Sequence, residues 1–188
     1  MTAAEKLQLS YADYLALEAK SVERHEFIAG EVFAMAGGTI EHARLQGAIA
    51  RELGTALSGK PCNVYSSDLR IRVTQSDRAT YADVVVICGK AEASPDDPNA
   101  VLNPIVIVEV VSETSEAYDR GDKFIHYRRI PSLQEYVLVS QKARRIEVYR
   151  RAGTEWVLSE SEGAGEAKLP SIGVVLHLDD VYRDPTAA

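Results

Sequence analysis

The chain has 188 residues, of which 46% are hydrophobic, and it carries a formal net charge of −7 at pH 7. This length suffices for one buried core and is short for two ordinary domains, so we expect a single domain over residues 1–188. No apolar run approaches the roughly 20 residues that cross a bilayer, and residues 1–10 lack the basic and apolar blocks of a secretory signal. We therefore expect a cytoplasmic protein with no membrane segment.

The acidic balance argues against broad attraction to nucleic acid, because phosphate binding is normally driven by a positive surface. The average hides an asymmetry along the chain. Residues 120–151 hold nine Lys or Arg against three acids, so one face could still be basic.

The chain has two cysteines, Cys62 and Cys88. Their wide separation matches neither a zinc knuckle nor a disulfide framework. We therefore interpret both as small core residues.

The first third of the chain predicts a helix, a hairpin and a second helix. Ser10 begins a capping box, which predicts a short helix after it. The segments His25–Ile28 and Glu31–Met35 alternate as two short strands of a hairpin. Thr39 then caps a longer amphipathic helix closed by Gly59, which we expect to pack on a sheet.

Three extended segments follow and predict the central strands. Asn63–Val73 alternates in polarity, Ala79–Cys88 ends in an apolar run, and Pro104–Ser112 is apolar throughout except for one acid. Between the last two, Gly89–Asn103 contains prolines and aspartates that interrupt a strand. We expect an exposed loop there.

The last third predicts a crossover and an edge hairpin. Ser115 caps a helix running to about Ile130, and Glu135–Ser140 is the next strand, so a strand, helix, strand unit results. Two further strands with a Gly turn between them predict an antiparallel hairpin at the sheet edge. Residues 159–168 are polar and predict a mobile loop. The pattern as a whole is that of an α/β fold.

Glu109 is the most informative residue, because it interrupts an apolar strand. Burying its carboxylate costs several kcal/mol unless a cation or hydrogen bonds compensate. A structural explanation would be a salt bridge to a neighbouring Arg or Lys, with Arg70 and Arg72 as possible partners, or a position at an exposed strand end. A functional explanation is a bound metal ion.

Asp83 supports the functional explanation. It precedes the apolar run of one central strand, whereas Glu109 comes near the end of another, so the two carboxylates can converge. Hard cations such as Mg²⁺ and Mn²⁺ take oxygen ligands and need one or two carboxylates beside waters and a substrate phosphate. The alternative for Asp83 is a strand-end or turn contact.

Several segments taken together resemble one known family. In chain order they are His25-Glu-Phe-Ile-Ala-Gly-Glu31-Val-Phe, Tyr81-Ala-Asp83, Pro104-Ile-Val-Ile-Val-Glu109-Val-Val-Ser112, Asp119 to Lys123 with Tyr127, and Glu135-Tyr-Val-Leu-Val139. They resemble the Uma-two family of restriction-endonuclease-like proteins, and the match covers most of the chain. The resemblance implies the PD-(D/E)xK nuclease superfamily, with a restriction-endonuclease-like mixed central β-sheet flanked by helices.

The resemblance also implies roles for individual residues. In that superfamily an Asp and a Glu bind the metal and a Lys assists phosphodiester hydrolysis. Asp83 and Glu109 would thus be catalytic ligands of Mg²⁺ or Mn²⁺. Glu31 would be a third acid that reaches the metal directly or through water, although without the resemblance we would place it on the surface.

This sequence departs from the superfamily pattern twice. Ala82 replaces a proline, which only shapes the backbone. Val111 stands where the lysine belongs, and residues two apart on a strand share a face, so that lysine would lie beside Glu109. Related members place a lysine on the following helix, which makes Lys123 the candidate to stabilise the attacking hydroxide or the pentacovalent phosphate. An i,i+4 ion pair with Asp119 is the alternative.

Three further residues are candidates for substrate binding. His42 faces the site if its helix packs over it, although a lone histidine is more often structural. Tyr118 and Tyr127 could contact substrate or stack on a base. For Tyr127, packing on the sheet is the alternative.

The leading hypothesis is a magnesium- or manganese-dependent endonuclease that hydrolyses phosphodiester bonds in DNA. The alternative is a non-catalytic protein on the same fold that binds nucleic acid or a partner, which the negative charge and Val111 favour. A purely structural module is the third interpretation. Exposed sheet edges and the benefit of two sites for cutting both DNA strands favour a homodimer.

Overall fold

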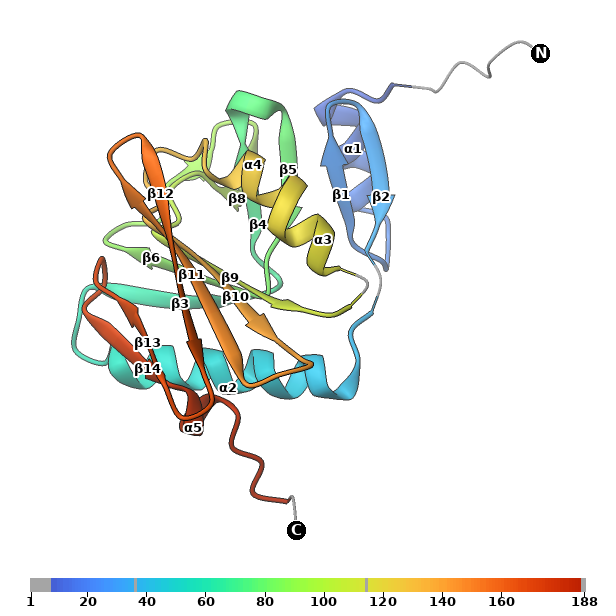
Figure 1. The fold of residues 1–188 in the computed structure, drawn as a ribbon. Coiled ribbons are helices and arrows are strands. Elements are labelled where there is room, and N and C mark those ends of the chain that lie inside the picture. The colour runs from blue at the N-terminus through green and yellow to red at the C-terminus, as the bar shows by residue number, and fades with distance from the viewer. Residues whose placement is uncertain (1–7, 36, 114, 187–188) are drawn as a thin grey trace.

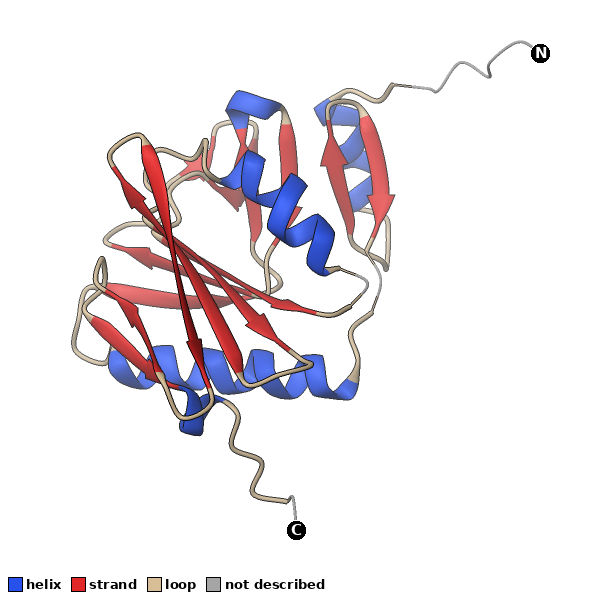
Figure 2. Cartoon of the chain, viewed as in Figure 1, coloured by secondary structure: helices blue, strands red, loops and turns tan. Residues whose placement is uncertain are grey.

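In the part of the chain that the structure describes, the strands form two six-stranded sheets and one two-stranded sheet. The computed structural model describes residues 8–35, 37–113 and 115–186. One large sheet, the central sheet, has helices on both faces, and the other, the N-terminal sheet, lies beside it (Figures 1 and 2). The predicted α/β class, with a mixed central sheet flanked by helices and an added antiparallel hairpin, is confirmed.

The central sheet has the strand order β12-β11-β10-β9-β6-β3. Its strands are β3 (Cys62–Ser66), β6 (Val84–Cys88), β9 (Val106–Val111), β10 (Glu135–Ser140), β11 (Arg145–Ala152) and β12 (Glu155–Glu162). β9 and β10 are parallel and joined by the predicted helical crossover, whereas the other neighbours are antiparallel. The predicted edge hairpin is β11 and β12.

Different elements cover the two faces of the central sheet (Figure 1). On one face lie α2 (Ile40–Ala56), α5 (Leu178–Val181) and the hairpin of β13 (Glu166–Leu169) and β14 (Val174–His177). On the other lie α3 (Glu116–Tyr118), a π turn (Asp119–Lys123) and α4 (Phe124–Tyr127). We call these the α2 face and the α4 face.

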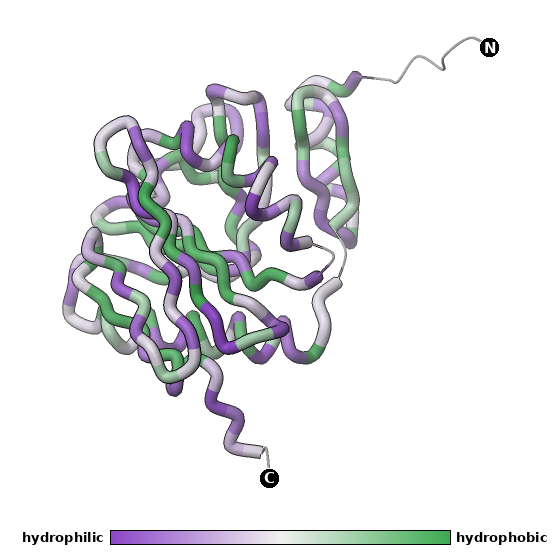
Figure 3. The backbone as a smooth tube through the Cα atoms, viewed as in Figure 1, coloured by the Kyte–Doolittle hydropathy of each residue, from purple (hydrophilic) through white to green (hydrophobic). Residues whose placement is uncertain are grey.

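The sequence pattern explains why α2 packs where it does. The Thr39 hydroxyl accepts a hydrogen bond from the backbone of His42, which caps the helix as predicted. Leu45, Ile49 and Leu53 are four residues apart and fully buried against the sheet. Each contributes about 1.5–3 kcal/mol through burial. The central strands beneath the helices are the most hydrophobic part of the chain (Figure 3).

The N-terminal sheet has the order β2-β1-β5-β4-β8-β7. Its elements are α1 (Tyr11–Glu18), β1 (His25–Ile28), β2 (Glu31–Ala34), β4 (Arg70–Val73), a 3-10 turn (Thr74–Ser76), β5 (Arg78–Tyr81), β7 (Ala93–Ser94) and β8 (Asp97–Val101). The predicted capping box at Ser10 and the predicted hairpin β1–β2 are both confirmed. α1 packs on β1 through Tyr14 and Phe27.

Two predicted strands are each divided between the sheets, so these predictions were wrong. Residues 63–73 form parts of β3 and β4, and residues 79–88 form parts of β5 and β6. The chain passes from one sheet to the other at Ser67–Leu69 and again at Ala82–Asp83. The residues on either side of each crossing are equally extended, so local periodicity cannot reveal that the partner strand changes.

Two predicted loops also contain strands. Residues 89–103 include β7 and β8, where Asp97 is buried and pairs with Arg70. Residues 159–168 include the end of β12 and the start of β13. Both segments were predicted as loops because they are polar. The residues that pair with their polar side chains in the fold, such as Arg70 with Asp97, lie far away in the sequence.

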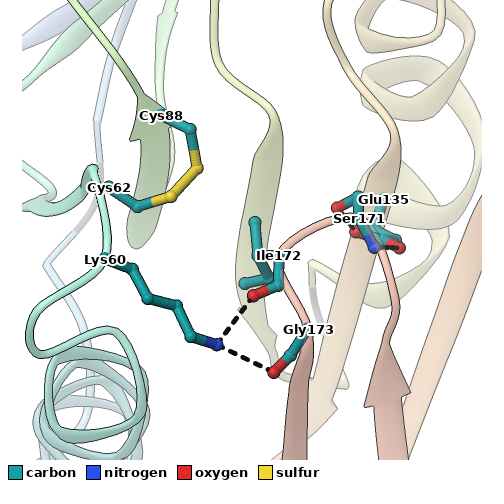
Figure 4. Close-up of a disulfide and its surroundings, with 7 residues drawn as sticks. All are labelled: Lys60, Cys62, Cys88, Glu135, Ser171, Ile172 and Gly173. Carbon is teal, nitrogen blue, oxygen red and sulfur yellow. Dashed lines mark hydrogen bonds between the residues drawn. A yellow bond between two sulfur atoms is a disulfide. The ribbon is translucent and has the colours of Figure 1, made fainter.

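The interpretation of the cysteines as separate core residues was wrong. Cys62 and Cys88 form a disulfide between β3 and β6 (Figure 4). The antiparallel register of these strands places the two residues opposite each other. A spacing along the sequence carries no information about such cross-strand neighbours, which is why the pairing was missed.

The helix predicted from Ser115 to Ile130 is shorter and irregular. The Ser115 side chain makes no capping hydrogen bond. The π turn separates the short helix α3 from the short helix α4, which ends at Tyr127. A π turn inserts one extra residue into the helical path and is frequent at functional sites. In the part of the chain that the structure describes, none of the helices has both the length and the apolar character to cross a lipid bilayer.

Candidate active site

A cavity of about 750 Å³ opens between the β1–β2 hairpin and the α4 face of the central sheet. This volume falls in the range of pockets that enclose small ligands, about 300–1,000 Å³. The chemically active side chains among its lining are Glu26, His42, Asp83, Glu109, Tyr118, Asp119, Asp122, Lys123 and Gln141. The N-terminal sheet, α2, the central strands and the π turn all contribute to it.

Glu109 lies on β9 with its side chain on the α4 face, and it is 4% exposed. The Lys123 ammonium donates to its Oε1 at 3.0 Å, and the Tyr127 hydroxyl donates to the same oxygen at 3.1 Å. Burial, with the nearby charges of Asp83 and Asp119, raises the pKa of Glu109 well above its usual value. The carboxylate is therefore held at a position where an additional cation would be favourable.

The two arginines considered as possible partners of Glu109 are engaged elsewhere. Arg70 pairs with Asp97, and Arg72 donates to Asp77 at 2.6 Å. The salt bridge that the structural explanation expected is made by Lys123, at 3.0 Å, and not by Arg70 or Arg72.

Lys123 comes from the π turn and is 8% exposed. Its Nζ lies 3.7 Å from Oε1 of Glu26 and 3.6 Å from Oδ1 of Asp119, in addition to its contact with Glu109. Burial alone would lower the pKa of Lys123, but Glu109 and the other acids outweigh it and raise that pKa well above its usual value. The ion pair with Asp119 and the approach to Glu109 thus coexist.

Asp83 stands where the chain crosses from β5 into β6. Its Oδ2 accepts a hydrogen bond from the backbone N–H of Val110 at 2.7 Å, which fixes it beside the end of β9. Its backbone oxygen accepts from Gln46 of α2 at 3.0 Å. The fold therefore brings Asp83 next to Glu109, as their places in the sequence predicted.

His42 lies in the first turn of α2 and faces the cavity. Its Nε2 is 2.9 Å from Oδ1 of Asp83, and this hydrogen bond raises the pKa of His42. Gln141 approaches the other ring nitrogen at 3.4 Å. The Gly38 backbone passes so close that a Cβ there would lie 2.8 Å from the imidazole Cδ2. The loop and Gln141 thus hold the ring against Asp83.

Glu26 was missed in the sequence, and it lines the cavity beside Lys123. Its carboxylate accepts from the Tyr118 hydroxyl at 2.8 Å and from Thr80. Burial would raise the pKa of Glu26, but Lys123, Thr80 and the other donors outweigh it and lower that pKa. Glu31 is not among the cavity residues. The available signal was that Glu26 precedes the buried Phe27, so it must face the opposite side of the strand.

The two tyrosines differ in accessibility. Tyr118 lines the cavity, although its hydroxyl is already engaged by Glu26 and Arg78. Tyr127 is fully buried and donates to Glu109. Packing, together with that hydrogen bond, therefore describes Tyr127, and a base cannot stack on it.

The donor set has the chemistry of a site for a hard divalent ion. Five acids line the cavity, namely Glu26, Asp83, Glu109, Asp119 and Asp122. Within the described residues, no group of three or more His, Cys, Asp or Glu is arranged as a metal-binding cluster. Mg²⁺ needs only one or two carboxylates beside waters and a substrate phosphate. Asp83 and Glu109 meet that requirement.

Comparison with known proteins shows the family of the chain. The family model Uma2, described as "Putative restriction endonuclease", matches residues 11–179. Two proteins of Synechocystis sp. are similar along most of the chain. The protein sll1609 is 36% identical, over 82% of this chain and 88% of its own length. The protein slr1290 is 32% identical, over 94% of this chain and 92% of its own length.

A solved structure shares the fold. It is a crystal structure from Anabaena variabilis described as a "putative nuclease belonging to DUF820", and it superposes with a TM-score of 0.73 at 15% sequence identity. The superposition covers 90% of this chain and 96% of the other. At this identity the likeness shows the fold alone.

Proposed function

The chain belongs to the Uma2 family, and from this premise we propose that it is a Mg²⁺- or Mn²⁺-dependent endonuclease that hydrolyses phosphodiester bonds in DNA. The family description and the fold support a nuclease in general. The metal ion, the DNA substrate and the residue roles below are our proposal.

The contact between Lys123 and Glu109 is the observation that carries the proposal. Val111 removes the lysine expected on β9, and Lys123 brings an ammonium to the same carboxylate from the π turn. A buried Lys and several buried acids are expensive to maintain for stability alone, since apolar residues of similar volume pack as well or better. Their concentration at a cavity therefore favours a catalytic purpose.

Each residue has a distinct task in the proposed reaction. Asp83 and Glu109 would hold the divalent ion, which supplies a polarised phosphoryl group and a bound water of lowered pKa. Lys123 orients the nucleophilic water and stabilises the charge that develops on the phosphate. His42 keeps Asp83 in place, and Tyr127 does the same for Glu109.

Glu26, rather than Glu31, is the third acid of the proposed site. Its carboxylate and those of Glu109 and Asp119 surround the Lys123 ammonium. This arrangement keeps the ammonium charged and directed at the reacting groups, so Glu26 acts by positioning Lys123.

The assembly and the location are proposals of the same kind. The edge strands of the two six-stranded sheets can pair with those of a second copy, so we propose a homodimer. We also propose a cytoplasmic location. Sedimentation of the full chain tests the first, and detection of the chain in separated cell fractions tests the second.

Metal titration tests the proposal against the non-catalytic alternative, which the net charge of −7 favours. Mn²⁺ and Mg²⁺ are titrated calorimetrically into wild type, Glu109→Gln and Glu135→Gln. Glu135 is the matched control, because it is also a buried acid on a central strand but lies at the far end, bonded to Ser171 (Figure 4). We expect Glu109→Gln to lose metal binding and Glu135→Gln to retain it. Equal binding by all three proteins would refute the assigned ligands.

A further inference from the structure

The β1–β2 hairpin has two faces with different surroundings. On one face Phe27 is buried and packs on Tyr14 beneath α1. On the other face Ile28 and Phe33 line the cavity, and Phe33 is 45% exposed. A large aromatic ring that folding leaves open at a cavity wall is available to a ligand.

The position of Phe33 relative to the acids is set by the hairpin register. Phe33 pairs directly with Glu26, and paired residues in an antiparallel ladder share one face with Cβ atoms about 4.5–5.5 Å apart. Glu26 in turn lies 3.7 Å from the Lys123 ammonium. A ligand on the Phe33 ring would thus have its next chemical group within reach of the carboxylates and Lys123.

The charge of the cavity restricts what that ligand is. Lys123 is the one Lys or Arg among its described lining residues, against five acids. A sugar-phosphate backbone running along this cavity would be repelled, because several phosphates would face five carboxylates that one ammonium and one proposed divalent ion do not fully offset. An uncharged planar group is not repelled, and it gains stacking and apolar contact from the hairpin wall.

We infer that the cavity holds a nucleobase, withdrawn from its neighbours and stacked on Phe33, while the adjoining phosphate reaches Lys123 and the divalent ion proposed at Asp83 and Glu109. The substrate class is therefore single-stranded or locally unpaired nucleic acid, since a base inside a duplex cannot enter without unstacking. This inference rests on the proposed nuclease function for the fate of the phosphate. Base binding itself is measurable without cleavage.

The test measures equilibrium binding of a single-stranded oligonucleotide carrying one 2-aminopurine, with Ca²⁺ in place of Mg²⁺. Wild type should bind it more tightly than the matching duplex, with a change in 2-aminopurine fluorescence. Phe33→Ala should weaken binding about 5- to 150-fold, the usual loss when an aromatic platform under a base is removed. Phe33→Trp should retain binding. Val157→Ala is the matched control, because Val157 is also an exposed apolar side chain, 46% exposed, but lies on β12 outside the cavity lining.

The outcomes separate this inference from the nuclease proposal. Equal affinities for wild type and Phe33→Ala, or no preference for the single strand, would overturn base binding even if metal-dependent cleavage is intact. Affinity that depends on Phe33 without any cleavage would uphold base binding and remove the nuclease proposal. Calorimetric Mn²⁺ binding by Phe33→Ala should equal that of wild type, which shows that any loss is not a loss of fold.

Discussion

The two faces of the central sheet are built from the same strands and have opposite character. On the α2 face, β9 presents Val108 and Val110 to a largely aliphatic core. On the α4 face the intervening residue of β9 is Glu109, surrounded by a lysine, a tyrosine and further acids. Because side chains alternate along a strand, β9 can contribute valines to one face and a carboxylate to the other. The α4 face therefore combines its own buried hydrophobic residues with buried charges, whereas β9 adds only valines to the α2 face.

Replacing Lys123 should have the largest effect on the stability of the α4 face. In Lys123→Met the three surrounding carboxylates lose their shared cation, and breaking a buried ion pair in this way costs about 3–5 kcal/mol. We expect that loss in the free energy of urea unfolding at pH 7, together with loss of DNA cleavage.

A second substitution distinguishes charge from packing at this position. Adding Glu109→Gln to Lys123→Met removes one of the stranded acids, so the double variant should be more stable than Lys123→Met alone. If the two losses of stability simply add, Lys123 and Glu109 are not coupled as the 3.0 Å contact requires.

A cavity in the core of the α2 face should lower the stability of the protein without changing its metal binding. Leu53 is fully buried among the aliphatic side chains of that face, so Leu53→Ala should lower the free energy of unfolding by about 2–5 kcal/mol. Below its melting transition the variant should bind Mn²⁺ with the affinity of wild type. Weakened metal binding by a fully folded Leu53→Ala would show that the two faces are not independent.

Tyr127 offers the mildest change, because Tyr127→Phe deletes one hydroxyl and keeps the ring. Its hydrogen bond to Glu109 joins a charged group, for which the usual loss of stability is about 1.5–3 kcal/mol. Thermal unfolding measures that loss. If the hydroxyl also orients the carboxylate, the affinity for Mn²⁺ should fall as well, whereas an unchanged affinity would limit Tyr127 to packing.

The sequence predicted those parts of the fold that depend on neighbouring residues. The capped helices, the β1–β2 hairpin and the β9 and β10 strands follow from local periodicity and caps. The crossings at Ser67–Leu69 and Ala82–Asp83, and the disulfide partner of Cys62, depend on which strand lies alongside. Neither the turn residues nor the spacing along the sequence indicates which strands become neighbours.

The residues of the candidate site also fall into two groups, those that local sequence patterns indicate and those that depend on distant parts of the chain. Glu109 could be found because a charge interrupts an apolar run, and Asp83 because it precedes one. Lys123 came from the family resemblance. Glu26 depends on the hairpin register and on a lysine nearly a hundred residues later in the chain, so the nearby Glu31 was chosen in its place.

The most direct test of the nuclease proposal is the rate at which purified wild type, Glu109→Gln and Glu135→Gln cleave DNA, supplied as single strands and as supercoiled plasmid with Mn²⁺ or with chelator. We expect metal-dependent cleavage by wild type and Glu135→Gln, and a loss of at least about 100-fold in Glu109→Gln with the fold intact by circular dichroism. Cleavage by Glu109→Gln at the wild-type rate, or no cleavage by wild type with any metal, would contradict it.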